Sequence, residues 1–198
     1  GLAGWLHGIT GADLHMSRTE WLQANLLLKE IPAEEMAALV AHCRRAGAPQ
    51  EFLEYLPKRG MLYPKWVGPL PRRYLRVAAG DVLKMAGTEW RVMIGEGHAP
   101  EMICLHSAER DLLIAADQIL GHISPHIGVQ PSDPGADNLC AFLRSLETFE
   151  ALPAGTHVLP SHGEPFDGLH ARIAVLKAHH EERLARLIDF CATPRTAM

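Results

Sequence analysis

The chain has 198 residues, of which 47% are hydrophobic and 21% charged, a composition typical of one globular domain. Its net charge of -4 gives no general attraction to nucleic acid or to an acidic membrane, and no apolar run is long enough to span a bilayer. The four cysteines are scattered without C-x-x-C spacing, which favours reduced thiols and a cytoplasmic location.

The N-terminal part of the chain is predicted to be mainly helical. Residues 2–9 have an apolar helical pattern, and residues 13–16 form a short predicted strand. Ser17, followed three residues later by Glu20, is a capping box that predicts a helix running to about Leu28. Apolar residues then recur at helical spacing and predict another helix; they are Met36, Leu39, Val40 and Cys43.

Residues 45–80 are predicted to form a partly helical insertion, because several prolines and glycines interrupt this segment. From residue 55 onward the insertion is basic and aromatic and contains no acidic residue. It is either a solvated basic surface or a substrate flap, since arginine and aromatic side chains suit phosphates and bases. The candidate substrate contacts in it are Tyr63, Trp66, Arg72 and Arg73.

The rest of the chain alternates between predicted strands and helices. Such an arrangement predicts an α/β fold in which helices cover a sheet. A hairpin with a glycine-containing turn opens this region, and a long helix with an apolar stripe closes it. The predicted strands are 81–85, 89–94, 102–105, 112–116 and 157–159, and the predicted helices are 137–151 and 168–191.

A side chain able to bind a metal follows the carboxyl end of each of three predicted strands. His98 follows one strand in Gly-Glu-Gly-His, Asp117 directly follows another, and His162 follows the last in Pro-Ser-His-Gly. Side chains at the carboxyl ends of neighbouring strands can converge at one edge of a sheet. Imidazole and carboxylate groups bind zinc, iron or manganese in hydrolytic sites, so the pattern predicts a metal centre.

These motifs, in this order, resemble those of the metallo-β-lactamase superfamily of hydrolases. The resemblance rests on "GEGHAPEMICLHSAERDLLIAADQIL" and "VLPSHGEPFDGLHARI". It implies a partial αββα sandwich and a two-zinc site, with iron or manganese as alternatives. By the resemblance, His98 belongs to the first metal, Asp117 is the catalytic carboxylate that bridges both metals, and His162 belongs to the second metal.

The sequence departs from the family at its start. The family's His-x-His-x-Asp-His motif should end just before Gly1, and it does not occur in the residues shown. We therefore expect residues 1–198 to be one domain fragment that lacks the N-terminal strands of the sandwich. By itself this fragment should be inactive and bind zinc poorly, and an exposed sheet edge should favour homo-oligomers.

The resemblance implies that a metal-bound hydroxide attacks the carbonyl of a small acyl thioester or ester. A first alternative is an endoribonuclease, because the "HHEERLARL" helix resembles a subgroup with a winged-helix domain after it. A second is a non-catalytic member that binds metal or a partner. No membrane partner is expected.

The remaining histidines have less specific predictions. His122 and His126 lie just after Asp117, where the family places substrate-pocket residues, so they are candidate substrate contacts. His106 precedes a predicted hairpin loop and should be solvated. His180 should be partly buried on the last helix, and Cys104 should be a core residue.

Overall fold

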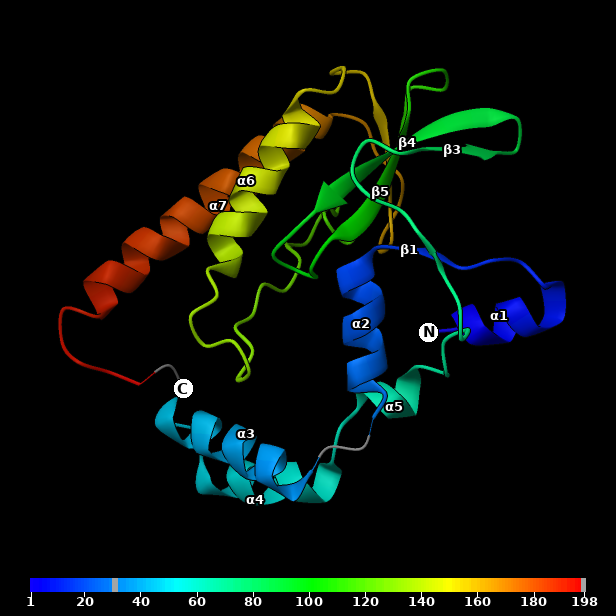
Figure 1. The fold of residues 1–198 in the computed structure, drawn as a ribbon. Helices are drawn as coiled ribbons and strands as arrows, with labels where there is room; N and C mark the ends of the chain where they lie inside the picture. The colour runs from blue at the N-terminus through cyan, green and yellow to red at the C-terminus, as the bar shows by residue number, and fades with distance from the viewer. Residues whose placement is uncertain (30–31, 197–198) are drawn as a thin grey trace.

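The computed structural model describes residues 1–29 and 32–196 and shows a mixed α/β architecture (Figure 1). A five-stranded sheet has the order β3-β4-β5-β6-β7, and a smaller sheet pairs β1 with β2. The strands are β1 (His15–Met16), β2 (Leu75–Arg76), β3 (Val82–Met85), β4 (Thr88–Gly95), β5 (Met102–Ser107), β6 (Leu112–Ala116) and β7 (His157–Pro160). The helices are α1 (Ala3–Thr10), α2 (Arg18–Leu27), α3 (Ala33–Arg45), α4 (Gln50–Arg59), α5 (Tyr63–Trp66), α6 (Asn138–Glu150) and α7 (Leu169–Phe190).

The directions of the strands determine where their ends meet. β3, β4, β5 and β6 are antiparallel to one another in turn, whereas β6 and β7 are parallel. β4, β6 and β7 therefore run in the same direction, and their carboxyl ends lie at one edge of the sheet. This is the geometry that the strand-end pattern of the sequence predicted.

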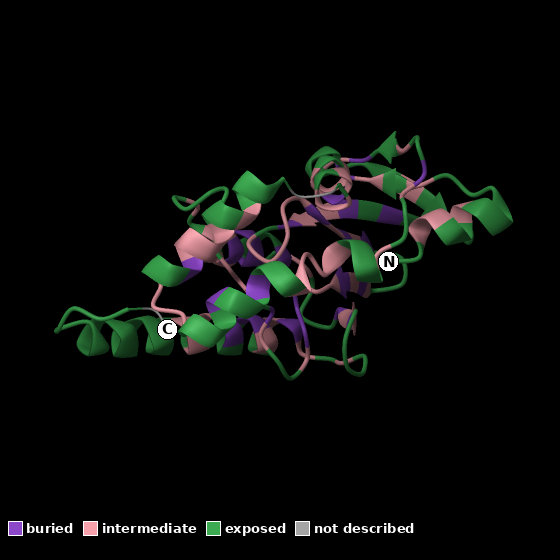
Figure 2. Ribbon diagram, turned by 90° about the horizontal axis from the view of Figure 1, so that it is seen from below, coloured by how far each residue is buried: buried purple, intermediate pink, exposed green. Residues whose placement is uncertain are grey.

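The main core lies between the sheet and the two helices α6 and α7, which run side by side along it (Figure 1). Figure 2 shows the buried residues on the strands and on the adjoining helix faces. Phe142, Leu146 and Phe149 of α6 are fully buried, and each contributes roughly 1.5–3 kcal/mol of hydrophobic stabilisation. Cys104 is a core residue as predicted, and burial raises the pKa of its thiol to about 12.

In β6, Leu113 and Ala115 are fully buried, whereas Leu112, Ile114 and Ala116 are partly buried. One prediction about burial is wrong. His106 is not solvated: it is only 8% exposed, because its position in β5 places it beside Leu113 of β6. His180 is partly buried, as predicted.

The long helix α7 is buried only in its first half. Leu169, Ile173 and Leu176 pack in the core, whereas Leu184 and Leu187, on the same predicted stripe, are 41% and 55% exposed. The helix has 22 residues and extends beyond the helix and strands that it covers, which leaves its second half in solvent (Figure 2).

The N-cap bond of the predicted capping box is present at the start of α2, where the Ser17 side chain accepts a hydrogen bond from the amide of Glu20. After α2, helices α3 and α4 pack against each other around a small core of Cys43, Leu53 and Leu56. The predicted partly helical insertion thus contains α4 and α5, and α4 pairs with a helix that lies before residue 45.

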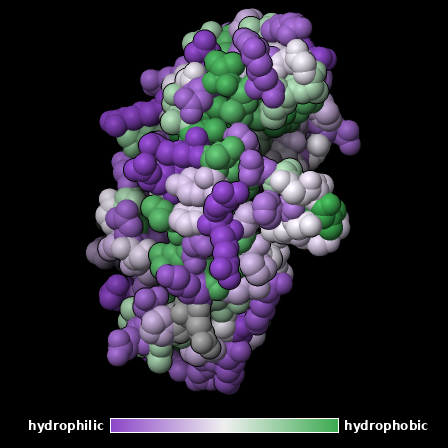
Figure 3. Space-filling model, turned by 45° about the vertical axis from the view of Figure 1, so that its right-hand side comes forward, coloured by the Kyte–Doolittle hydropathy of each residue, from purple (hydrophilic) through white to green (hydrophobic). Residues whose placement is uncertain are grey.

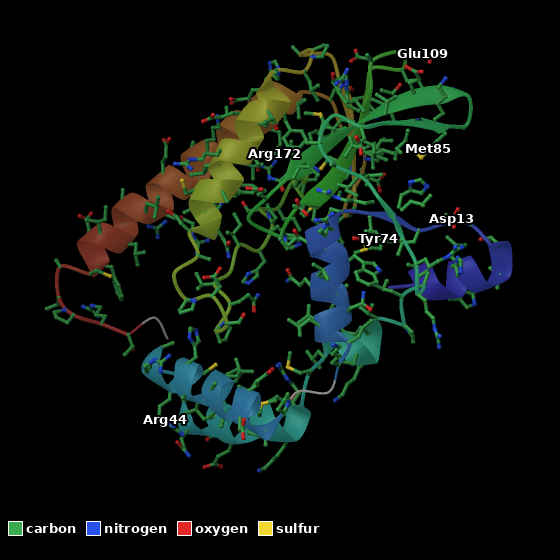
Figure 4. All side chains as sticks on the ribbon, viewed as in Figure 1. Asp13, Arg44, Tyr74, Met85, Glu109 and Arg172 are labelled. Carbon is green, nitrogen blue, oxygen red and sulfur yellow. The ribbon has the colours of Figure 1, made fainter. Side chains whose placement is uncertain are left out.

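The returning end of the insertion is held next to its beginning. β2 pairs in parallel with β1, and the rings of Trp21 and Tyr74 stack with centroids 4.7 Å apart. Figure 4 shows Tyr74 beside α2. The sequence predicts the strand at residues 13–16 but not its partner, because β2 is only two residues long.

Hydrophobic side chains also reach the surface. On the face shown in Figure 3 they occur in separate groups among hydrophilic side chains. The N-cap of α1, Leu2, and the helix residues Trp5, Leu6 and Ile9 are all strongly exposed. Of the helices in the described ranges, none combines the length and hydrophobicity needed to cross a bilayer.

Candidate metal centre

The three predicted metal-binding side chains meet at the carboxyl edge of the sheet. Nε2 of His98 lies 3.7 Å from Oδ2 of Asp117, and Nδ1 of His162 lies 2.6 Å from Oδ1 of the same carboxylate. The prediction that they cluster at one edge is therefore confirmed. Their role as metal ligands stays a prediction.

The orientation of His98 leaves one ring nitrogen free to bind a metal. Nδ1 of His98 lies 2.7 Å from the carbonyl oxygen of His126, which can only accept, so Nδ1 carries the proton and donates it. The other ring nitrogen, Nε2, is the one that lies toward Asp117. A backbone carbonyl that fixes the ligating imidazole in this way is typical of metal sites.

The spacing of His98 and Asp117 fits a shared ion. Zinc binds imidazole nitrogen at about 2.0–2.1 Å and carboxylate oxygen at about 2.0–2.2 Å, so two tetrahedral ligand atoms stand roughly 3.4 Å apart. The observed 3.7 Å is close to this value. The 2.6 Å contact of His162 is instead a hydrogen bond, and the side chain of His162 is 68% exposed.

Within the described ranges, no group of three or more His, Cys, Asp or Glu side chains is arranged so that it could hold a metal ion. A structural zinc site needs about four protein ligands and a catalytic site about three. The donor chemistry of His98 and Asp117 thus fits a metal, but residues 1–29 and 32–196 do not supply a complete ligand set.

The loop that carries His98 is fixed at both ends. The carboxylate of Glu101 accepts a hydrogen bond of 2.9 Å from the amide of Thr19 in the first turn of α2. Hydrogen bonding to Thr19, together with the positive charges of Arg76 and Arg18, lowers the pKa of Glu101. At the other end, Gly97 has a φ of +94° and lies so close to α6 that a Cβ would be 2.5 Å from the carbonyl oxygen of Asn138. Only glycine fits there.

The loop that follows Asp117 is held by α7. The guanidinium of Arg172 donates hydrogen bonds of 2.6 Å to the carbonyl of Leu120 and 2.8 Å to that of Ile123. Burial lowers the pKa of Arg172. Figure 4 labels Arg172 on α7.

A cleft of about 630 Å³ opens beside His98. One wall comes from α2, where Leu26 is 65% exposed, and the opposite wall comes from the loop before α6. Of the residues that line it, all of them described, none is Lys or Arg, whereas Glu96, Glu101 and Asp133 are acidic. The cleft therefore suits an uncharged or cationic group better than a polyanion.

The predicted substrate contacts occupy different places. His126 lines the cleft beside His98, whereas Arg72 and Arg73 line a second cavity together with Trp5. The remaining candidate on the loop after Asp117, His122, is exposed. Contact of these residues with a substrate stays a prediction.

Two candidates from the insertion differ in exposure. Trp66 is 73% exposed. Tyr63 is partly buried, and its pKa is raised by burial and by the charge of Glu20. The pKa of Glu20 is itself raised, mainly by burial, with His98 opposing and Glu101 adding to the shift. The charge of Glu20 thus affects the pKa of Tyr63, and the charges of His98 and Glu101 affect the pKa of Glu20.

Several residues that shape this site were not predicted from the sequence. Glu101 and Arg172 hold the loops, and Gln118 and Ser145 are buried beneath them. A sequence signal existed for Ser145, since it is a polar residue on the apolar stripe formed by Phe142, Leu146 and Phe149. The other contacts join residues that are far apart in the sequence.

No model of a known protein family matches the chain. Among solved structures, a β-lactamase domain protein from Burkholderia ambifaria is 35% identical, with a TM-score of 0.77 over 91% of this chain. A metallo-β-lactamase family protein from Thermus thermophilus is 28% identical, with a TM-score of 0.79 over 99% of this chain. The chain belongs to the metallo-β-lactamase superfamily.

The α/β fold with a mixed sheet is thus the metallo-β-lactamase fold, as the motifs predicted. The chain spans 50% of the Burkholderia protein and 61% of the Thermus protein. An uncharacterized protein of Aquifex aeolicus (strain VF5) is 35% identical over 49 residues, which are 25% of this chain and 23% of that protein.

Proposed function

We propose that the protein is a metal-dependent hydrolase that cleaves a thioester or ester of a small acyl group. The observation that carries this proposal is the meeting of His98, Asp117 and His162 at the edge of the sheet, beside the cleft. Zinc is the first expectation for the metal, with iron or manganese as alternatives, because imidazole and carboxylate suit all three.

A bound divalent cation would supply Lewis acidity, which activates water and polarises a carbonyl. The chain's own residues bind and orient. His98 presents Nε2 because His126 fixes its ring, and Asp117 stands between the two histidines, where its two oxygens can serve both sides. The apolar wall of α2, with Leu26 and Leu27, would receive an acyl chain.

The cleft favours the acyl substrate over RNA. An RNA substrate would bring several phosphates close to the metal, and no Lys or Arg lines this cleft within the described residues. The endoribonuclease alternative depends instead on Arg72 and Arg73, which line the second cavity. A bound RNA would have to contact both the candidate metal centre and this second cavity.

The test uses protein expressed from its complete gene, whose codons upstream of Gly1 also show whether the His-x-His-x-Asp-His motif is encoded. Hydrolysis of acyl thioesters of increasing chain length is measured with and without a chelator. We expect activity that depends on zinc, is lost in His98→Ala and is retained in the control His15→Ala, because His15 is exposed and far along the chain from the loops. Metal binding without turnover of any thioester, ester or RNA would support the non-catalytic alternative instead.

A further inference from the structure

A buried polar cluster lies beneath the loop that carries His98 and the loop that follows Asp117; these are called the metal loops. Gln118, the neighbour of Asp117, is fully buried, and Ser145 of α6 is 7% exposed. The side-chain amide of Gln118 donates a hydrogen bond of 2.8 Å to Oγ of Ser145. The backbone amide of Glu96, two residues before His98, donates to the same oxygen at 3.3 Å.

The hydroxyl of Ser145 is thus the meeting point of the two loops. Its own proton goes to the carbonyl oxygen of Phe142 at 2.8 Å, so its lone pairs face Gln118 and Glu96. This fixes the orientation of the Gln118 amide, because only its NH2 group can point at Ser145. One serine on α6 therefore connects the loop of His98 with the loop of Asp117.

The side chain of Gln118 includes a buried polar atom that is unfavourable for folding, which indicates a functional role. Oε1 of Gln118 is buried and has no hydrogen-bond partner among the described residues. It also lies so close to Gly95 that a Cβ there would be 2.3 Å away. An apolar side chain at position 118 would avoid the unpaired carbonyl, so folding alone does not favour glutamine. A buried polar group that is unfavourable for folding is expected where the residue has a role in function.

We propose that Gln118 and Ser145 are positioning residues that set the spacing between His98 and Asp117. Because both side chains are buried, they would act through the two loops and not by direct contact with substrate or metal. Ser145 holds the backbone of the His98 loop through Glu96, and Gln118 holds the residue next to Asp117, so α6 fixes both loops through one oxygen. The inference rests on the metal site proposed above.

The decisive variant is Gln118→Met, in protein expressed from the complete gene. We expect the affinity for zinc to fall about 10–100-fold, as for other groups that orient metal ligands, with lower kcat and little change in KM. The unfolding temperature should not fall, because the unpaired carbonyl is removed as well. A merely structural residue would lower the unfolding temperature and leave zinc affinity unchanged, and that result overturns the proposal.

Ser145→Ala has a matched control one turn along the same helix. Thr148→Ala also removes a hydroxyl that donates to a backbone carbonyl. The hydroxyl of Thr148 donates to the backbone carbonyl oxygen of Ser145 at 2.7 Å and, in the described part of the chain, makes no hydrogen bond to either metal loop. Hydrogen exchange at the amide of Glu96, measured without metal, should become faster in Ser145→Ala and stay unchanged in Thr148→Ala. Unchanged exchange at Glu96, or equal losses of zinc affinity in both variants, overturns the proposal.

The two proposals fail differently. If the unsubstituted protein binds no divalent cation, the proposed metal-dependent function is wrong, and Glu96 exchange alone decides whether Ser145 holds the loop. If it binds zinc and both Gln118→Met and Ser145→Ala bind equally well, the site exists but these residues do not position it. If Ser145→Ala does not fold, Gln118→Met still decides the question.

Discussion

The sheet edge with its loops and the helical hairpin α3–α4 are stabilised in different ways. The loops of His98 and Asp117 depend on contacts with distant parts of the chain, through Glu101, Ser145 and Arg172. The hairpin instead has its own small core. The position of the candidate metal ligands thus depends on the packing of the sheet against α6 and α7. We expect changes in the hairpin to leave these side chains in place, because the hairpin has a separate core.

The largest effect is expected from replacing Asp117, which lies between His98 and His162 at the edge of the sheet. Asp117→Ala, in protein expressed from the complete gene, should reduce kcat/KM at least about 10²–10³-fold, because a shared anionic ligand worth several kcal/mol is removed. Thioester hydrolysis and zinc content are measured together. His106→Ala is a poor control, since His106 is buried, so exposed His15→Ala serves instead. Equal losses in both variants would contradict the assignment of Asp117.

The second prediction compares the two cores directly. Leu146→Ala and Leu53→Ala each remove a buried leucine side chain, and each should cost about 2–5 kcal/mol of unfolding free energy. For Leu146 the loss should be global and weaken zinc binding, because it lies next to Ser145. For Leu53 it should be confined to α3 and α4. Hydrogen exchange mapped along the chain distinguishes the two, and loss of protection in β4–β6 of Leu53→Ala would show that the regions are coupled.

The third prediction concerns the basic and aromatic part of the insertion, residues 55–80. Replacing Arg72, Arg73 and Arg76 together with glutamine should weaken binding of an anionic substrate. If the substrate is RNA, the loss should be steep in salt, with a slope change of about 2 in log K against log salt for three phosphate contacts. For an acyl thioester the salt dependence should be shallow. No change with either substrate would mean that the segment is a solvated surface.

The smallest expected effect concerns pH. Burial is the main reason why the pKa of His106 is lowered; Asp111 opposes this shift and Arg91 adds to it. Below about pH 6.5 the unfolded chain takes up a proton that the folded chain does not, so stability should fall as the pH drops through this value toward the lowered pKa. Denaturant unfolding of His106→Leu should show a shallower decrease between about pH 7 and pH 5. The pKa of His180 is lowered as well and affects both proteins alike.

The site was partly predictable from local sequence. Asp117 directly follows its strand, and His98 and His162 lie within three residues of the ends of theirs, so strand prediction was enough to place them at strand ends. The contacts of Gln118 and Arg172 were not predictable, because each joins segments more than 25 residues apart. His106 was predicted wrongly for a related reason: its burial comes from neighbouring strands rather than from its own segment.

By itself the sequence determined the order of the strands and helices outside residues 45–80, the cap of α2 and the strand-end position of each candidate ligand. These features depend on hydrophobic periodicity and on hydrogen bonds between near neighbours, which local residues specify. Only the tertiary structure decided which face of each strand is buried, how His98 is oriented and which buried hydroxyl connects the two loops. Those features depend on which distant segments meet, and the pairing of β4 to β7 and the packing of α6 and α7 bring them together.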